Sequence, residues 1–318
     1  MSTNTIVLTG AGGHVGGAVF KALSASHIGH LRASFRRTID LPDWARSHEM
    51  FVGDLAEPRT HDALLSGAST VLHLATSGYS SMAPANQQQL DDEVATAVAL
   101  ATSAARRGVR RFIFVSSIHI YGQRLVGVVN EMTEPEPHTD YGRSRAAIED
   151  ALSKLRQVTD MEIVVVRMSN AFGVPLFERP ASWQLLVPDL CRQVVESGQL
   201  RLRSSGRSLR NIIALRDAAG VLCNLARRDS PLDGTYLLGG PQTLTIQEIA
   251  EMVAEAASLS LGFTPTVEGG ENDMTTYERF ELDLGSLRQL GITLEDHRQA
   301  ELHDLLHFAV ARFNKQVT

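Results

Sequence analysis

The sequence is poor in cysteine and has no long apolar run. Its two cysteines, Cys191 and Cys223, lie 32 residues apart without a CxxC pair or a neighbouring histidine. Together with the absence of an HExxH motif, this predicts ordinary thiols and no metal site. No stretch approaches the ~18 apolar residues of a spanning helix, and the first residues lack the basic region of a signal peptide. We therefore expect a soluble cytoplasmic protein without a membrane partner.

A strong excess of charge is also lacking. The 318 residues include 30 lysines and arginines against 36 acidic residues, a net charge of −6. This gives no electrostatic reason to expect nucleic acid as a partner. Apolar residues make up 43% and charged residues 21%, close to soluble globular averages, which excludes a disordered or collagen-like chain. The length suits one large domain or two closely joined ones.

Short apolar, β-branched runs alternate with longer stretches of helical period up to about residue 172. The expected strands are 5–9, 31–35, 71–75, 112–116 and 163–167, and the expected helices are 16–25, 91–107 and 141–155. Strands separated by a dozen or more helical residues normally run parallel, with helices on both faces of the sheet. The predicted fold class is therefore α/β, with a doubly wound parallel sheet.

Beyond residue 172 the elements are shorter and are separated by proline and glycine. A helix is expected after Thr245, because Thr245 and Glu248 form a capping-box pattern. We expect residues 173–318 to form mainly a smaller substrate-binding lobe, with segments that return to the sheet domain. The apolar side chains of Phe177, Trp183 and Leu186 fit either a sugar pocket or the core of this lobe.

A glycine-rich turn joins the first strand to the first helix. It reads Gly10-Ala-Gly-Gly13-His-Val-Gly16, a GxxGxxG pattern. Glycines permit a tight turn and let a pyrophosphate approach backbone N–H groups at a helix N-terminus. A glycine-rich turn without a ligand is the alternative. The strand–turn–helix context favours a Rossmann-type dinucleotide-binding domain over residues 1–172, with the cofactor against Gly10, Gly13, His14, Val15 and Gly16.

The end of the second strand bears on the choice of cofactor. A carboxylate expected there would bind the adenosine ribose 2′-hydroxyl of NAD. The sequence has Arg36 and Arg37 instead, and guanidiniums suit a 2′-phosphate. The sequence therefore favours NADP(H) as the cofactor, with NAD(H) also possible. The alternative role for the two arginines is a strand end exposed to solvent.

Three residues form a candidate catalytic group: Ser117, Tyr141 and Arg145. Ser117 follows a buried strand, at the sheet edge where α/β proteins bind ligands. Tyr141 and Arg145 are four residues apart on one helix face. A cation beside a phenol is expected to lower the pKa of Tyr141, which would let it exchange a proton with a carbonyl or alcohol oxygen near neutral pH.

With these segments the chain resembles the extended short-chain dehydrogenase/reductase family of nucleotide-sugar epimerases, dehydratases and ketoreductases, over nearly its whole length. The matching segments are 9–16, 53–55, 71–75, Ser116-Ser117 with Tyr121-Gly122, Tyr141-x-x-x-Arg145, 167–175, and Arg210 followed by Asp217. The family pattern has lysine, which bonds the nicotinamide ribose, where this chain has Arg145. Asp92 and Glu93 stand where many relatives have asparagine.

The resemblance implies roles for further residues. Asp54, with Leu55 beside it, would meet the adenine, and Leu74, Ala75 and Thr76 would line the cofactor. Asn170 and Arg210 would face a nucleotide-sugar, and His119 either reaches the substrate or packs. The family also implies a homodimer through the helix at 91–107 and the helix that carries Tyr141.

Residues 31–37 and 236–240 look most like dTDP-4-keto-6-deoxyhexose 4-ketoreductases. The expected function is therefore NADPH-dependent reduction of a keto group on a nucleotide-activated sugar, an oxidoreductase activity of deoxysugar biosynthesis. The alternatives are an epimerase or dehydratase that retains NAD(P), and a non-catalytic dinucleotide sensor, which the Lys-to-Arg change at position 145 suggests.

Overall fold

A seven-stranded sheet forms the centre of the computed structural model, which describes residues 4–26, 29–76, 86–122, 125–270 and 277–313. The strand order is β11-β7-β5-β4-β1-β2-β3 and every pairing is parallel. The strands are β1 (Thr5–Thr9), β2 (His30–Phe35), β3 (Glu49–Val52), β4 (Ala68–His73), β5 (Arg111–Ser117), β7 (Glu162–Met168) and β11 (Gly234–Leu238). The predicted Rossmann-type sheet is confirmed.

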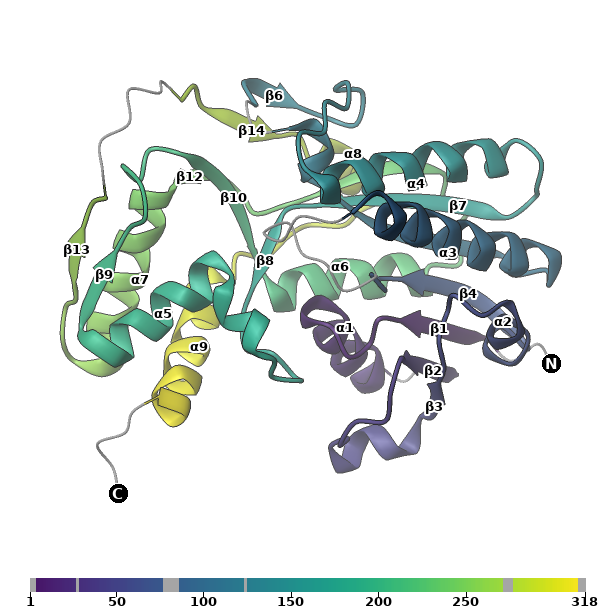
Figure 1. Cartoon of the computed structure of the whole chain (residues 1–318), viewed down its shortest axis with the longest axis horizontal. Helices are drawn as coiled ribbons and strands as arrows, with labels where there is room; N and C mark the ends of the chain where they lie inside the picture. Colours follow the sequence, from purple (N-terminus) through teal and green to yellow (C-terminus); the bar gives the residue numbers. More distant parts are fainter. Residues whose placement is uncertain (1–3, 27–28, 77–85, 123–124, 271–276, 314–318) are drawn as a thin grey trace.

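Helices cover both faces of this sheet (Figure 1). One face carries α1 (His14–Ala25) and α6 (Leu215–Arg227), and the other carries α2 (Pro58–Leu64), α3 (Gln87–Arg106) and α4 (Asp140–Arg156). Helix α3 begins four residues earlier than expected because Asn86 caps it in a capping box with Gln89. The strand β3 and the helix α2 were not predicted, since β3 is short and half exposed.

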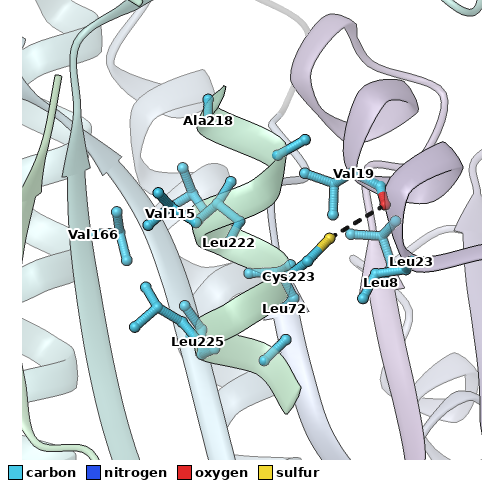
Figure 2. Close-up of a cluster of buried hydrophobic side chains, with 14 of the residues drawn as sticks. Leu8, Val19, Leu23, Leu72, Val115, Val166, Ala218, Leu222, Cys223 and Leu225 are labelled. Atoms are coloured by element: carbon cyan, nitrogen blue, oxygen red, sulfur yellow. Dashed lines mark hydrogen bonds between the residues drawn. The ribbon is translucent and has the colours of Figure 1, made fainter. Parts of the chain in front are cut away.

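The core between the sheet and the α1–α6 layer is apolar throughout (Figure 2). Val19 and Leu23 of α1, Leu222 of α6 and the strand residues Leu8 and Leu72 all belong to this core. All five side chains are fully buried. Near-complete burial of such side chains is the main favourable contribution to folding, and it holds the turn between β1 and α1 in a fixed position.

The second hydrophobic core lies in the lobe beyond the sheet (Figure 1). Its helices are α5 (Leu186–Ser197), α7 (Ile246–Leu261) and α9 (Arg298–Phe313). The predicted capping box of Thr245 and Glu248 opens α7. Trp183 stacks on Phe308 at 5.7 Å between ring centroids and is buried, which places it in the lobe core.

Short elements complete the chain. Strands β8 (Asn170–Phe172), β10 (Leu209–Ala214) and β12 (Thr243–Thr245) form a three-stranded sheet. The two-stranded pairs are β9 (Gln199–Arg201) with β13 (Thr266–Glu268), and β6 (Gly127–Val129) with β14 (Phe280–Leu282). The remaining helical segments are α8 (Gly285–Gln289) and the 3-10 turns η1 (Asp43–Ser47), η2 (Ile118–Tyr121) and η3 (Pro180–Gln184).

Two segments from beyond residue 172 belong to the central sheet layer. Strand β11 pairs with β7, and α6 packs against α1. The position of the domain boundary at residue 172 remains a prediction from the sequence. Within the described ranges, no helix is long and apolar enough to cross a membrane.

Candidate functional site

A cavity of about 540 Å³ opens at the carboxyl ends of the central strands. The strand order reverses between β1 and β4, and such a switch point is where doubly wound sheets bind their ligands. The lining residues are Gly10, Gly12, Gly13, Ser34, Phe35, Arg36, Arg37, Ile39, Gly53, Asp54, Leu55, Ala56, His73, Leu74, Ala75, Thr76, Asp92, Glu93, Thr96 and Arg179. Most of the predicted cofactor-binding residues therefore meet around one cavity.

The glycine turn shapes one wall of this cavity. Gly10 has a φ of +73°, and a Cβ there would stand 2.6 Å from the backbone nitrogen of Ala75. The N–H of Gly13 donates to the Gly10 carbonyl at 2.8 Å, which closes the turn ahead of α1. Only glycine allows both this backbone conformation and this close approach to the end of β4.

Three predicted cofactor residues of the turn do not line the cavity. Gly16 lies beneath the turn, where a Cβ would collide with the Gly10 carbonyl. Val15 packs against the core of the sheet. Burial lowers the pKa of His14 to about 4, so its ring is neutral at pH 7. Gly16, Val15 and His14 are therefore absent from the cavity lining.

The far end of the cavity is positively charged. Arg36 and Arg37 lie at the end of β2, and Arg36 Nη2 donates to the carbonyl of Thr76 at 3.2 Å. Sequence reasoning missed Arg179, whose guanidinium lies over Gly12. It reaches the cavity by tertiary packing, because the neighbouring Phe177 stacks edge-on against Phe35 of β2. No local pattern around position 179 signals this.

His73 lies at the base of the cavity as a satisfied core residue. Its Nδ1 is 2.7 Å from the hydroxyl oxygen of Thr9 on the neighbouring strand. Burial, with a smaller effect of the Arg145 charge, lowers the pKa of His73 to about 3. The neutral ring joins β1 to β4 directly below the glycine turn.

Ser117 and Tyr141 come together from different elements. Ser117 ends β5, and Tyr141 stands in the first turn of α4, which Thr139 caps. The Ser117 hydroxyl interacts with the phenol of Tyr141 and acts to lower its pKa. The backbone N–H of His119 also donates to Ser117 Oγ at 3.2 Å, which satisfies one lone pair and leaves the hydroxyl proton available for donation.

The expected substrate-binding residues cluster around the same hydroxyl pair. The ring of His119 meets Tyr141 edge-on at 5.9 Å between centroids. Its Nε2 is 3.4 Å from Oδ1 of Asn170, on β8. Burial lowers the pKa of His119, with the nearby Arg210 charge adding to it. Asn170 is held in turn by a hydrogen bond to the carbonyl of Asn211.

Arg145 lies directly against Tyr141. Its guanidinium carbon is 5.1 Å from the centroid of the Tyr141 ring and 5.2 Å from that of Phe114. It forms a buried ion pair with Glu93 of α3. Glu93 also lines the cavity. No local spacing predicts its pairing with Arg145, because the two residues are far apart in the sequence.

The predicted effect of Arg145 on Tyr141 was wrong. Burial raises the pKa of Tyr141, and only the hydrogen bond with Ser117 opposes it. The physical reason lies in the geometry: the guanidinium faces the ring of Tyr141 and its charge is already paired with a carboxylate. Tyr141 is therefore a neutral phenol at pH 7.

Among the described residues there is no group of three or more histidine, cysteine, aspartate or glutamate side chains that could hold a metal ion. Both cysteines are buried, and burial raises the pKa of the Cys223 thiol to about 12. Their predicted behaviour as ordinary thiols is in keeping with this.

Comparison with known proteins identifies the family. The model of the NAD dependent epimerase/dehydratase family matches residues 6–239. The chain belongs to this family. UDP-glucose 4-epimerase of Vibrio cholerae is 27% identical over 258 residues, which cover 80% of this chain and 75% of that protein.

Solved structures share the fold of this epimerase/dehydratase family member. UDP-N-acetylglucosamine 4-epimerase from Methanobrevibacter ruminantium M1, in complex with UDP-N-acetylmuramic acid, matches with a TM-score of 0.83 at 16% identity, covering 98% of this chain and 100% of that one. UDP-glucuronic acid 4-epimerase from Bacillus cereus, in complex with UDP-glucuronic acid and NAD, matches with a TM-score of 0.81 at 17% identity. The match covers 97% of this chain and 99% of that one. At these identities the likeness shows the fold alone.

Proposed function

We propose that this epimerase/dehydratase family member uses NADPH to reduce a keto group on a nucleotide-activated sugar, a dTDP-4-keto-6-deoxy sugar in the first instance. The observation that carries the proposal is the meeting of Ser117, at the end of β5, with Tyr141, at the start of α4, where both contact His119. A relative named UDP-glucose 4-epimerase supports a nucleotide-sugar as the substrate class.

The cavity suits a nicotinamide dinucleotide, which supplies a hydride when bound. Its volume falls in the range of cofactor sites. The Gly10–Gly13 turn presents backbone N–H groups at the N-terminus of α1, where an anion is favoured. Arg36 and Arg37 at the end of β2 favour a 2′-phosphate, and hence NADP(H) over NAD(H). Asp54, Leu55, Leu74 and Ala75 would complete the binding surface.

Tyr141 would supply the proton of the reduction. When the carbonyl carbon receives a hydride, its oxygen takes the phenolic proton and the product is an alcohol. Ser117, whose Oγ accepts the N–H of His119, would donate its hydroxyl proton in a hydrogen bond to the same carbonyl oxygen. Such a bond stabilises the charge that develops there in the transition state.

The remaining residues would hold the substrate. Asn170 and His119 flank the hydroxyl pair, where they would contact the sugar. Arg210 is the cation close to His119 and would pair with the diphosphate of the nucleotide.

A second candidate function is an epimerase or dehydratase that retains its dinucleotide throughout the cycle. The name of the Vibrio cholerae relative favours it. Such an enzyme would purify with bound dinucleotide and would need no added hydride source, whereas the reductase would consume NADPH.

We also propose a homodimer formed through α3 and α4. These helices pack together on one face of the sheet (Figure 1). Half-exposed Val98 and Thr102 and exposed Ala95 give the outer side of α3 small side chains that permit close helix packing. Light scattering at micromolar concentration tests this, and a monomer contradicts it.

Titration calorimetry tests the proposed function. Protein stripped of cofactor would be titrated with NADPH and NADH, and then with dTDP in the presence of the tighter cofactor. We expect NADPH to bind more tightly than NADH, and dTDP to bind next. Binding of NADPH without dTDP would remove the nucleotide-sugar assignment and leave a smaller carbonyl substrate or a sensor.

A further inference from the structure

The ion pair of Arg145 and Glu93 is unusually well shielded from water. The side chains are 1% and 4% exposed, respectively. Arginine does not lose its proton in proteins, so the cation persists at every working pH. A buried cation of this kind is tolerated only with a counter-ion. Glu93 is therefore ionised, and the net charge of the pair is zero.

Arg145 is the partner of the ion pair that lies against Tyr141. The guanidinium carbon of Arg145 lies 5.1 Å from the Tyr141 ring centroid, while Glu93 pairs with the guanidinium from the neighbouring helix α3. The other polar groups around the phenol are Ser117, which is uncharged, and His119, whose pKa is lowered by burial. His73 beyond Arg145 is neutral as well, and the charge of Arg210 lies behind His119.

An unpaired guanidinium at this distance would change the chemistry of the phenol. An opposite charge within about 4–6 Å favours an ionised group by about 1–3 pH units. Instead, burial raises the pKa of Tyr141. The carboxylate of Glu93 is paired with the guanidinium of Arg145, and a paired negative charge offsets the field of the cation.

We propose that Glu93 is a positioning residue that fixes Arg145 against Tyr141 and cancels its charge, so that Tyr141 meets the substrate as a neutral phenol ready to donate a proton. The inference rests on the proposed reductase function and deepens it. A neutral phenol serves reduction, in which the tyrosine gives up a proton. Oxidation of an alcohol would need the phenolate as a base.

The decisive variant is Glu93→Gln, which keeps the shape of the side chain and removes the counter-charge. Reduction requires a protonated Tyr141, so its rate falls as the pH rises through the pKa of that group. We expect the midpoint of this alkaline fall to move down by at least about one pH unit in the variant. Asp91→Asn, an exposed residue of α3 outside the cavity, is the matched control and keeps the wild-type midpoint.

A spectroscopic titration gives a second readout that needs no turnover. Ultraviolet absorbance of phenolate would be followed with pH in Glu93→Gln, and the same titration of Glu93→Gln combined with Tyr141→Phe would be subtracted. We expect the difference to show Tyr141 ionising at lower pH than in the wild type. If Glu93→Gln does not fold, Glu93→Asp withdraws the carboxylate by one methylene and should shift the midpoint the same way by less.

Midpoints that coincide with the wild type in both measurements would overturn the role of Glu93. That failure is distinct from failure of the proposed function. A Tyr141→Phe variant with full turnover would reject the reductase mechanism itself, whereas an inactive Tyr141→Phe together with an unshifted Glu93→Gln would reject only the inference about Glu93.

Discussion

At the scale of single residues, the proposed chemistry depends on two hydroxyl groups and their surroundings. Ser117 is buried at the end of β5 and Tyr141 is held in the first turn of α4. Ser117 accepts the backbone N–H of His119, and the ring of His119 meets that of Tyr141 edge-on. Because the phenol stays neutral, its proton is available at pH 7 without a preceding ionisation step.

Replacing Tyr141 with phenylalanine removes the proposed proton donor and little else. We expect turnover to fall by roughly 10²- to 10⁴-fold, the usual contribution of a positioned acid. NADPH affinity, measured by calorimetry on the same variant, should stay within about twofold. Turnover that survives the change would mean that another group protonates the ketone.

The two arginines at the end of β2 carry the proposed choice of cofactor. Replacing Arg36 and Arg37 with glutamine removes charge-assisted bonds worth about 1.5–3 kcal/mol each. NADPH affinity should fall by at least about tenfold while NADH affinity changes little. Arg46→Gln, an exposed arginine outside the cavity, is the control. An equal loss of affinity for NADPH and NADH would show that neither arginine binds the 2′-phosphate.

At the scale of elements, Arg111 joins three parts of the sheet layer. It begins β5 and its side chain has no exposed surface. It donates to the carbonyls of Leu225 and Arg228 at the end of α6, and to that of Ser230 on the way to β11. Its Nε bonds Glu162 at 2.6 Å. These bonds satisfy carbonyls that the end of a helix leaves unpaired.

Replacing Arg111 with methionine should therefore lower the free energy of unfolding strongly. The change leaves Glu162 and three carbonyls without their buried partner, and removing one side of a buried pair costs about 3–5 kcal/mol. Arg110→Met is the control, because the Arg110 side chain is 37% exposed and its contact with Glu162 is longer, at 3.4 Å. Losing this exposed contact should lower the free energy of unfolding by no more than about 1 kcal/mol. Denaturant unfolding followed by circular dichroism compares them, and equal losses would contradict this account.

The elements that the sequence predicted are those with a strong local pattern. The runs that became β1, β4, β5 and β7 are continuous and apolar, so their burial between two helix layers followed from composition alone. Strand β3 was not predicted because it is only four residues long, with both end residues exposed and the middle two half-buried. The contacts of Glu93 and Arg179 escaped for a different reason: each depends on which elements pack together, and no spacing along the chain encodes that.

At the scale of the whole molecule, the cavity draws on both ends of the fold. The glycine turn and β2 come from the first residues, while Arg179 arrives from the segment leading into the second lobe. Asn170 of β8 and Arg210 of β10 add polar groups near His119. A ligand that fills this cavity contacts residues of both cores that flank the central sheet, such as Phe35 and Leu55.

Binding of the cofactor should accordingly stabilise the entire chain. A ligand at 100 times its dissociation constant adds about 2.7 kcal/mol to the free energy of unfolding. We expect NADPH to raise the thermal midpoint more than NADH does at equal concentration, and the Arg36→Gln, Arg37→Gln variant to lose that difference. Scanning fluorimetry measures it, and identical midpoints with the two cofactors would contradict a preference for NADPH.

The most direct test of the central claim is the stoichiometry of cofactor use. Purified protein would be mixed with NADPH and a dTDP-4-keto-6-deoxyhexose, and the loss of nicotinamide absorbance would be compared with the amount of alcohol formed. We expect one NADPH to be oxidised for each keto group reduced. A sugar that is epimerised or dehydrated while the NADPH concentration stays constant would contradict it.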